Sequence, residues 1–132
     1  MKVFAGGSKT LKELTEEMRS ALDRLCGVGA DFLVGDCFGA DRLIQAYLSQ
    51  RGYERVTVYV SGARVRNNVG SFPVIRVCGG GLTGFDLYRQ KDIAMAKAAD
   101  LGLMFWDGST HGTFCNIRDL KEMGKDVTVI LS

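Results

Sequence analysis

The sequence predicts an α/β fold in which helices cover both faces of a parallel, five-stranded sheet. Short apolar segments alternate along the chain with amphipathic ones, which is the pattern of strands joined by right-handed crossover helices. The apolar run Leu101–Phe105 is interrupted only by Gly102, as expected for a strand covered on both faces. The length of 132 residues indicates one three-layer domain over residues 1–132 with a single core.

Five segments are predicted to form the strands, because each is short, rich in β-branched or aromatic residues and bounded by Gly, Asp or Ser. They are Lys2–Ala5, Phe32–Val34, Val56–Val60, Leu101–Phe105 and Val127–Leu131. Numbered along the chain, we expect these strands in the order 3-2-1-4-5. This order places the ends of the first and fourth strands at the switch point, where open parallel sheets bind ligands.

Four amphipathic segments are predicted to form helices, because apolar residues recur in them at steps of three and four. They are Thr10–Cys26, Gly39–Arg51, Asp86–Ala99 and Gly112–Met123. Thr10 and Glu13 match a capping box, which predicts that the first helix begins at Thr10.

Residues 61–85 fit no regular element and are predicted to form an irregular insertion. The stretch contains six glycines, and such segments are typically functional loops, small hairpins or mobile chain. Val74–Val77 is the one candidate in it for a short extra strand. Arg66 and Asn67 carry donors that suit a phosphate or carboxylate, with ordinary surface charge as the alternative.

Composition and charge exclude several classes of protein. Hydrophobic residues make up 46% and charged residues 24% of the chain, which favours a globular protein over a disordered one. The formal net charge of +2 disfavours nucleic acid as a partner bound through phosphate neutralisation. No apolar run approaches the roughly 18 residues that span a bilayer, and no signal peptide is recognised. We therefore expect a cytoplasmic protein that has no membrane contact.

The four cysteines show no CxxC spacing, and the chain has a single histidine. This inventory predicts reduced, mostly buried thiols, and neither a metal site nor a cofactor.

The residues directly after the strands are the candidates for chemistry, because ligands bind at the carboxyl edge of a parallel sheet. Glycine-rich turns follow the first, second and fourth strands, and each leads into a helix N-terminus. Free amides and the positive end of the helix dipole favour a phosphate or carboxylate there. We expect amides from the three turns to gather around one anion. The alternative is that these residues only form tight turns and helix caps.

Two common nucleotide motifs are absent. The chain has no GxxxxGK[ST] segment, which excludes a P-loop nucleoside triphosphatase, and no GxGxxG with a following acid, which disfavours dinucleotide-dependent hydride transfer. Lys91 and Asp92 are adjacent on a predicted helix and so are not expected to face one ligand together. The candidate ligand-binding residues are Gly6, Gly7, Ser8, Gly35, Asp36, Gly39, Asp41, Arg42, Arg66, Asn67, Lys91, Asp107, Gly108, Ser109, Thr110, Gly112 and Thr113.

Five segments of the chain form a distinctive set: VFAGGSKTL, LVGDCFGADRLIQAYL, RNNVG, KDIAMAKAADLGLMFWDGSTHGT and GKDVTVI. They resemble the SLOG superfamily, in particular small bacterial and phage proteins of the DUF2493-like type. The resemblance implies a Rossmann-like fold, a nucleotide-derived ligand and a homodimer or higher homo-oligomer. It implies a phosphate side formed by Gly6, Gly7, Ser8, Gly108, Ser109, Gly112 and Thr113, and a ribose side formed by Gly35, Asp36, Asp41 and Asp107.

The expected function is binding of a nucleotide or nucleotide-derived small molecule at the carboxyl edge, with sensing of that ligand as one role. The alternative is hydrolysis of a nucleoside-monophosphate N-glycosidic bond, as in the related Lonely Guy phosphoribohydrolases. No carboxylate follows Gly112-Thr113, where those enzymes carry a Glu. The candidate catalytic residues are therefore Asp36, Asp107, Lys91 and Asp92. Single-stranded DNA binding, by analogy with the related DNA-processing protein, is disfavoured by the near-neutral charge.

Overall fold

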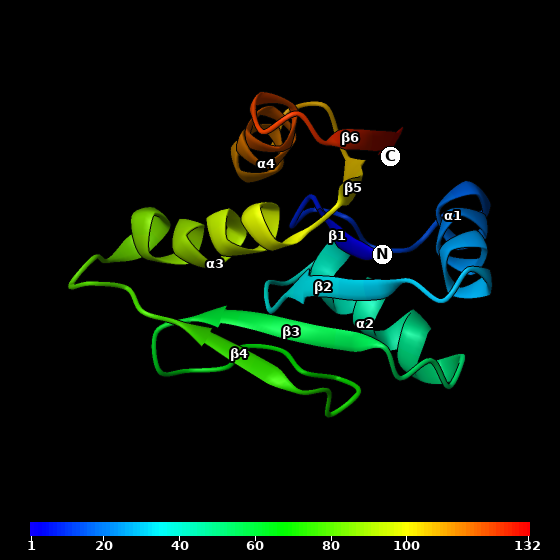
Figure 1. The fold of residues 1–132 in the computed structure, drawn as a ribbon, viewed down its shortest axis with the longest axis horizontal. Helices are drawn as coiled ribbons and strands as arrows, with labels where there is room; N and C mark the ends of the chain where they lie inside the picture. Colours follow the sequence, from blue (N-terminus) through cyan, green and yellow to red (C-terminus); the bar gives the residue numbers. More distant parts are fainter.

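The computed structural model describes residues 1–132 as an alternation of six strands and four helices (Figure 1). The strands are β1 (Lys2–Gly7), β2 (Asp31–Gly35), β3 (Val56–Ser61), β4 (Val74–Val77), β5 (Leu101–Trp106) and β6 (Asp126–Leu131). The helices are α1 (Glu16–Gly27), α2 (Ala40–Gln50), α3 (Gly84–Ala98) and α4 (His111–Glu122). The protein is therefore α/β, and its architecture is consistent with a Rossmann-like fold.

All six strands form one parallel sheet in the order β4-β3-β2-β1-β5-β6. The five expected strands keep the expected relative order, but the expected number of strands is wrong. Val74–Val77 pairs with β3 and extends the sheet by one edge strand. This strand has only four residues, three of them exposed, and Arg76 interrupts its apolar residues. It therefore gives a weaker sequence signal than the longer apolar runs of the other strands.

The sheet buries side chains on both faces. Along β1, Val3 and Ala5 belong to the core beneath α1 and α2, whereas Phe4 belongs to the core beneath α3 and α4. Successive strand residues point to opposite faces, so two separate apolar cores result. Figure 1 accordingly shows α2 on the other side of the sheet from α3.

The first helix begins later than its sequence signal indicates. Its N-cap is Thr15, whose hydroxyl accepts the backbone N–H of Met18 at 3.3 Å. The expected capping box at Thr10 and Glu13 is therefore wrong. Thr10 instead donates its hydroxyl to Asp107 at 2.7 Å, a contact 97 residues away in sequence that no local motif predicts.

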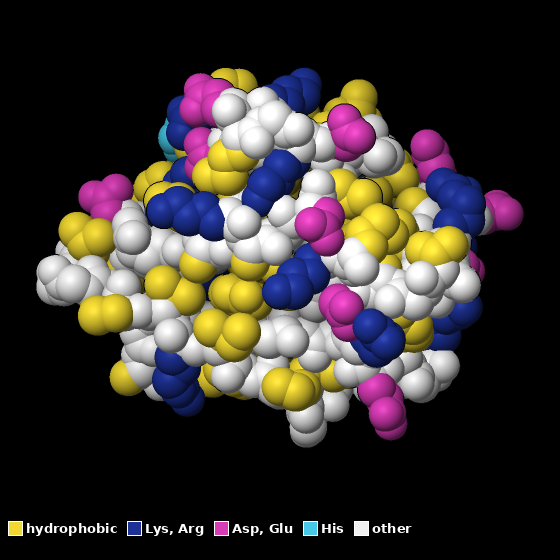
Figure 2. All heavy atoms as spheres, viewed as in Figure 1, with side chains coloured by type: hydrophobic (Ala, Val, Ile, Leu, Met, Phe, Trp, Pro, Cys, Tyr) yellow, Lys and Arg dark blue, Asp and Glu magenta, His cyan; other side chains and the backbone are white.

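The expected irregular stretch 61–85 holds the end of β3, all of β4 and the start of α3. Between β3 and β4, the loop is tied to Asp36 at the end of β2. Its carboxylate accepts the Arg66 backbone N–H at 2.9 Å and the guanidinium at 2.8 Å, and its carbonyl accepts the Asn67 side chain at 3.1 Å. Charged side chains of both signs are interspersed over the face shown in Figure 2. None of the helices has the length and hydropathy to cross a membrane.

Candidate functional site

A pocket of about 380 Å³ opens at the carboxyl edge of the sheet, beside the end of β1 and between the first turns of α3 and α4. The structure brings expected residues from five separate segments to this pocket. Those lining it are Gly6, Gly7, Asp41, Arg66, Lys91, Asp92, Thr110, Gly112 and Thr113. The expected residues outside it are Ser8, Gly35, Asp36, Gly39, Arg42, Asn67, Asp107, Gly108 and Ser109.

The first turn of α4 faces the pocket without a side-chain cap. The hydroxyl of its N-cap residue, Thr110, is bound to the Ser8 hydroxyl at 2.7 Å and makes no cap to the helix. His111, Gly112 and Thr113 follow as the first helical residues, and all three line the pocket. Amides at these positions have no partner within the helix, so they can bind an anion at the positive end of the helix dipole.

The amides of the other expected turns are largely satisfied within the protein. The Asp107 N–H donates to the Ser8 hydroxyl at 2.9 Å, and the Ala40 N–H donates to the Ser8 carbonyl at 3.1 Å. The Cys37 N–H donates to Asp41 at 3.1 Å. Neighbouring turns therefore satisfy several of these amides, and the gathering of amides from three turns around one anion stays a prediction. The first turn of α4 keeps the amides of His111, Gly112 and Thr113 unbonded.

Asp107 fixes the turn that leads into α4. One carboxylate oxygen accepts the backbone N–H groups of Ser109 at 2.9 Å and Thr110 at 2.8 Å, and the other accepts the Thr10 hydroxyl. The hydrogen bond from Thr10 and these two amides hold the pKa of Asp107 well below its usual range. Both oxygens are already engaged, so Asp107 shapes the site from outside the pocket.

Asp36 is also fully engaged by hydrogen bonds within the protein. It is 1% exposed, and both of its carboxylate oxygens are bound by Arg66. Neither Asp36 nor Asp107 reaches the pocket, so neither of these catalytic candidates is placed to contact a ligand there.

Asp41 lies in the floor of the pocket and is 7% exposed. Its Oδ2 accepts the Cys37 N–H, whereas its Oδ1 has no hydrogen-bond partner in the protein. Gly35 makes room for the carboxylate, because a Cβ there would lie 2.5 Å from Oδ2. A Cβ at Gly6 would be in ordinary contact with Oδ1, at 3.5 Å. Burial raises the pKa of Asp41 to about 7, against the opposing charge of Lys91.

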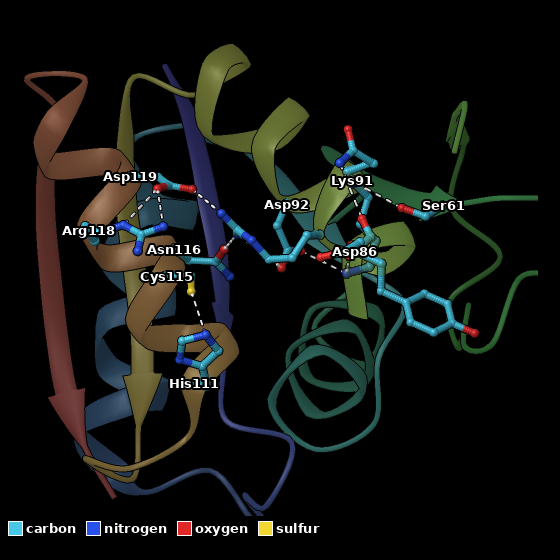
Figure 3. Close-up of polar contacts among 12 residues, drawn as sticks. Ser61, Asp86, Lys91, Asp92, His111, Cys115, Asn116, Arg118 and Asp119 are labelled. Atoms are coloured by element: carbon cyan, nitrogen blue, oxygen red, sulfur yellow. Dashed lines mark hydrogen bonds and ion pairs between the residues drawn. The ribbon is translucent and has the colours of Figure 1, made fainter. Parts of the chain in front are cut away.

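Lys91 and Asp92 both line the pocket, contrary to the expectation that adjacent helix residues cannot face one ligand. The long Lys91 side chain turns back on its neighbour, and its ammonium lies 2.8 Å from the Asp92 carboxylate (Figure 3). Burial alone would lower the pKa of Lys91, but Asp92 and Asp41 outweigh it and raise the pKa above its usual value. Lys91 is therefore a fixed cation beside Asp41.

Arg89 is a pocket residue that the sequence reasoning missed. It is 9% exposed and crosses from α3 to α4, where its guanidinium donates to Asn116 at 2.8 Å and pairs with Asp119. Figure 3 shows Asn116 and Asp119 on α4, facing this link. The available signal was Asn116 itself, because this polar residue lies four positions before Leu120 and so falls on the apolar side of α4.

Aromatic side chains from α3 form one wall of the pocket, and these too were missed. Phe85 and Tyr88 line it and remain 50% and 39% exposed. The Arg66 guanidinium lies 4.1 Å from the centre of the Tyr88 ring, and the His111 ring lies 5.5 Å from that of Phe85. This wall offers flat apolar faces to a ligand.

Comparison with family models, with curated proteins and with solved structures found no match to this chain. The resemblance to the SLOG superfamily therefore stays a prediction.

Proposed function

We propose that this protein binds a nucleotide or a nucleotide-derived small molecule in the pocket between α3 and α4. The observation that carries the proposal is the uncapped first turn of α4 opening into a pocket of about 380 Å³. That volume falls within the range of roughly 300–1,000 Å³ that is typical of small-molecule sites. The ligand's phosphate would lie against the amides of Gly112 and Thr113.

The charges around the pocket support an anion of limited charge. Of the four Lys and Arg side chains that line it, Arg66, Arg89 and Lys91 are already paired with carboxylates. Lys9 has no carboxylate partner within ion-pair distance and is free to approach a phosphate. One cation and one helix N-terminus suit a single phosphate group better than a polyphosphate or a nucleic acid backbone.

The aromatic wall supports a base or another flat group in the ligand. Phe85 and Tyr88 line the pocket from α3 and remain partly exposed, with His111 beside the Phe85 ring and Arg66 over the Tyr88 ring. Nucleobases stack on aromatic rings without sequence-specific hydrogen bonds. Because Phe85 lies beside Gly112, a flat group on this wall would bind next to the phosphate.

The test is calorimetric titration with AMP, ADP-ribose, NAD and cyclic nucleotides, using wild type and two variants at one position. A side chain at Gly112 fits, since the nearest heavy atom to its Cβ would be 4.0 Å away and its φ is not positive. Gly112→Asp places a negative charge where the phosphate would bind, and we expect it to weaken binding by about 100-fold or more. Gly112→Asn, of equal size and without charge, should bind within a few-fold of wild type.

Stability separates this effect from misfolding. A carboxylate in the first turn of a helix is favourable by about 0.3–1 kcal/mol, so Gly112→Asp should be at least as stable as Gly112→Asn. The absence of binding to every ligand at millimolar concentration would refute the proposal. Equal binding by both variants would refute the placement of the phosphate.

Binding is proposed in preference to N-glycosidic hydrolysis because all three candidate carboxylates are engaged within the protein. Asp36 and Asp107 are hydrogen-bonded outside the pocket, and Asp92 is paired with Lys91. Incubation with AMP followed by chromatography checks this choice. Release of free adenine above the uncatalysed rate would restore the hydrolase alternative.

A further inference from the structure

One acceptor in the pocket floor lacks a partner. Asp41 lines the pocket and is 7% exposed, and its Oδ2 is bound by the Cys37 N–H. Its Oδ1 lies beside the pocket residue Gly6 and makes no hydrogen bond within the protein. A buried carboxylate is costly unless hydrogen bonds satisfy it. Of the two carboxylates that line the pocket, Asp92 is paired with Lys91, whereas Asp41 forms no ion pair.

We propose that Asp41 Oδ1 accepts a hydrogen bond from a hydroxyl or N–H group of the ligand, and that the ligand is held by the ionised carboxylate, so that binding releases a proton. This inference rests on the proposed function and specifies its site. The ligand class is a phosphate ester that carries a hydrogen-bond donor at the far side of its sugar, and binding responds to pH near neutrality.

The surroundings of Asp41 explain why its proton is available. Lys91 and Asp92 face it from α3, and Asp36 and Cys37 lie on the turn before α2. Lys91 favours the ionised form, whereas burial and the two neighbouring carboxylates favour the protonated form. Burial prevails and raises the pKa of Asp41 to about 7, so the unliganded protein is a mixture of both forms at neutral pH. A donor on the ligand stabilises only the ionised form.

The experiment compares AMP with 2′,3′-dideoxy-AMP on wild type, Asp41→Asn and Gly6→Ala. Hydrogen bonds to charged groups are worth enough that wild type should prefer AMP by about 10- to 100-fold. Asp41→Asn keeps an acceptor for the Cys37 N–H but removes the charge, and the preference should fall to a few-fold. Gly6→Ala keeps the carboxylate and places a methyl group 3.5 Å from Oδ1, and it should lose the preference as well.

The pH dependence is the second readout. With a pKa of about 7, the ionised fraction of Asp41 rises about tenfold between pH 6 and pH 8, and AMP affinity should rise with it. The phosphate of AMP also titrates in this pH range, so Asp41→Asn is the control. The difference between the pH profiles of wild type and Asp41→Asn reports the ionisation of Asp41. Calorimetric titration at pH 7 in buffers of different ionisation enthalpy measures the number of protons released on binding. Wild type should release about half a proton more per bound ligand than Asp41→Asn.

The outcomes separate this inference from the proposed function. If AMP binds and Gly112→Asp abolishes binding, but Asp41→Asn keeps both the sugar preference and the pH profile, the role of Asp41 is refuted and the proposed function stands. If no ribose phosphate binds at millimolar concentration, both are refuted.

Discussion

Asp41 and Asp107 stand at the same edge of the sheet and have opposite surroundings. Asp107 follows β5 and receives hydrogen bonds on both oxygens, from a hydroxyl and two amides. Asp41 opens α2 after β2, is buried and receives one amide on one oxygen. The pKa of Asp107 is lowered, and that of Asp41 is raised to about 7. A carboxylate that the protein satisfies fully holds a turn, whereas one left partly unsatisfied is available to a ligand.

The largest expected effect tests the cost of burying Asp41. Its folded-state pKa of about 7 lies above the usual aspartate value of 3.8, so the folded state binds the proton more tightly and stability falls as pH rises from 4 to 7. The fall contributed by Asp41 is on the order of 4 kcal/mol. Asp41→Asn should lose this slope and be more stable than wild type at pH 8, as measured by urea unfolding. Asp126→Asn removes the same charge at an exposed position and should keep the wild-type dependence of stability on pH. The same dependence in Asp41→Asn would contradict the prediction.

The second effect tests the space reserved for the Asp41 carboxylate. Gly35→Ala puts a methyl group 2.5 Å from Oδ2, and overpacking of a buried site costs about 1–3 kcal/mol. The free energy of unfolding should fall by that amount. Gly27→Ala, at the end of α1 with no heavy atom within 4 Å of its Cβ, is the matched control and should not destabilise. Equal stability of the two variants would show that Asp41 has room to move.

The smallest effect concerns Asp107. Asp107→Asn can still accept the Ser109 and Thr110 amides, but its amide nitrogen cannot accept the Thr10 hydroxyl. Tm at neutral pH should fall by a few degrees. Because the pKa of Asp107 is lowered in the folded state, its stabilisation is present above pH 4 and lost as pH falls below it. The difference in Tm between this variant and wild type should therefore shrink in acid, opposite to the trend for Asp41; a constant difference would contradict this assignment.

Local patterns were sufficient for most of the fold. Apolar periodicity identified the four helices and the five longer strands, and the crossover rule gave their relative order. Val74–Val77 was identified only as a candidate strand and left out of the strand count, because a short edge strand is recognised mainly by its partner. The start of α1 was misplaced because Thr10 bonds to Asp107 across the sheet, and a capping box describes only local bonding.

The sequence predicted where the candidate site lies, but it predicted only some of the residues that line the pocket. Gly6, Asp41 and Gly112 could be predicted because each follows the end of a predicted strand, and ligands bind at that edge of a parallel sheet. The strand ends could not show that Asp36 is committed to Arg66, because that pairing depends on how residues 62–73 fold back over β2. Arg89 was missed for the same reason, since its partners lie on a different helix.

Ser8 holds together the segments that form the pocket in the unliganded protein. Its fully buried hydroxyl joins the end of β1 to the residues on both sides of the β5–α4 turn, through Asp107 and Thr110. These segments are about a hundred residues apart in sequence, and they are already immobilised against each other. The pocket floor and the first turn of α4 are thus preorganised. The protein loses little conformational entropy when a ligand binds, so the affinity depends mainly on direct contacts.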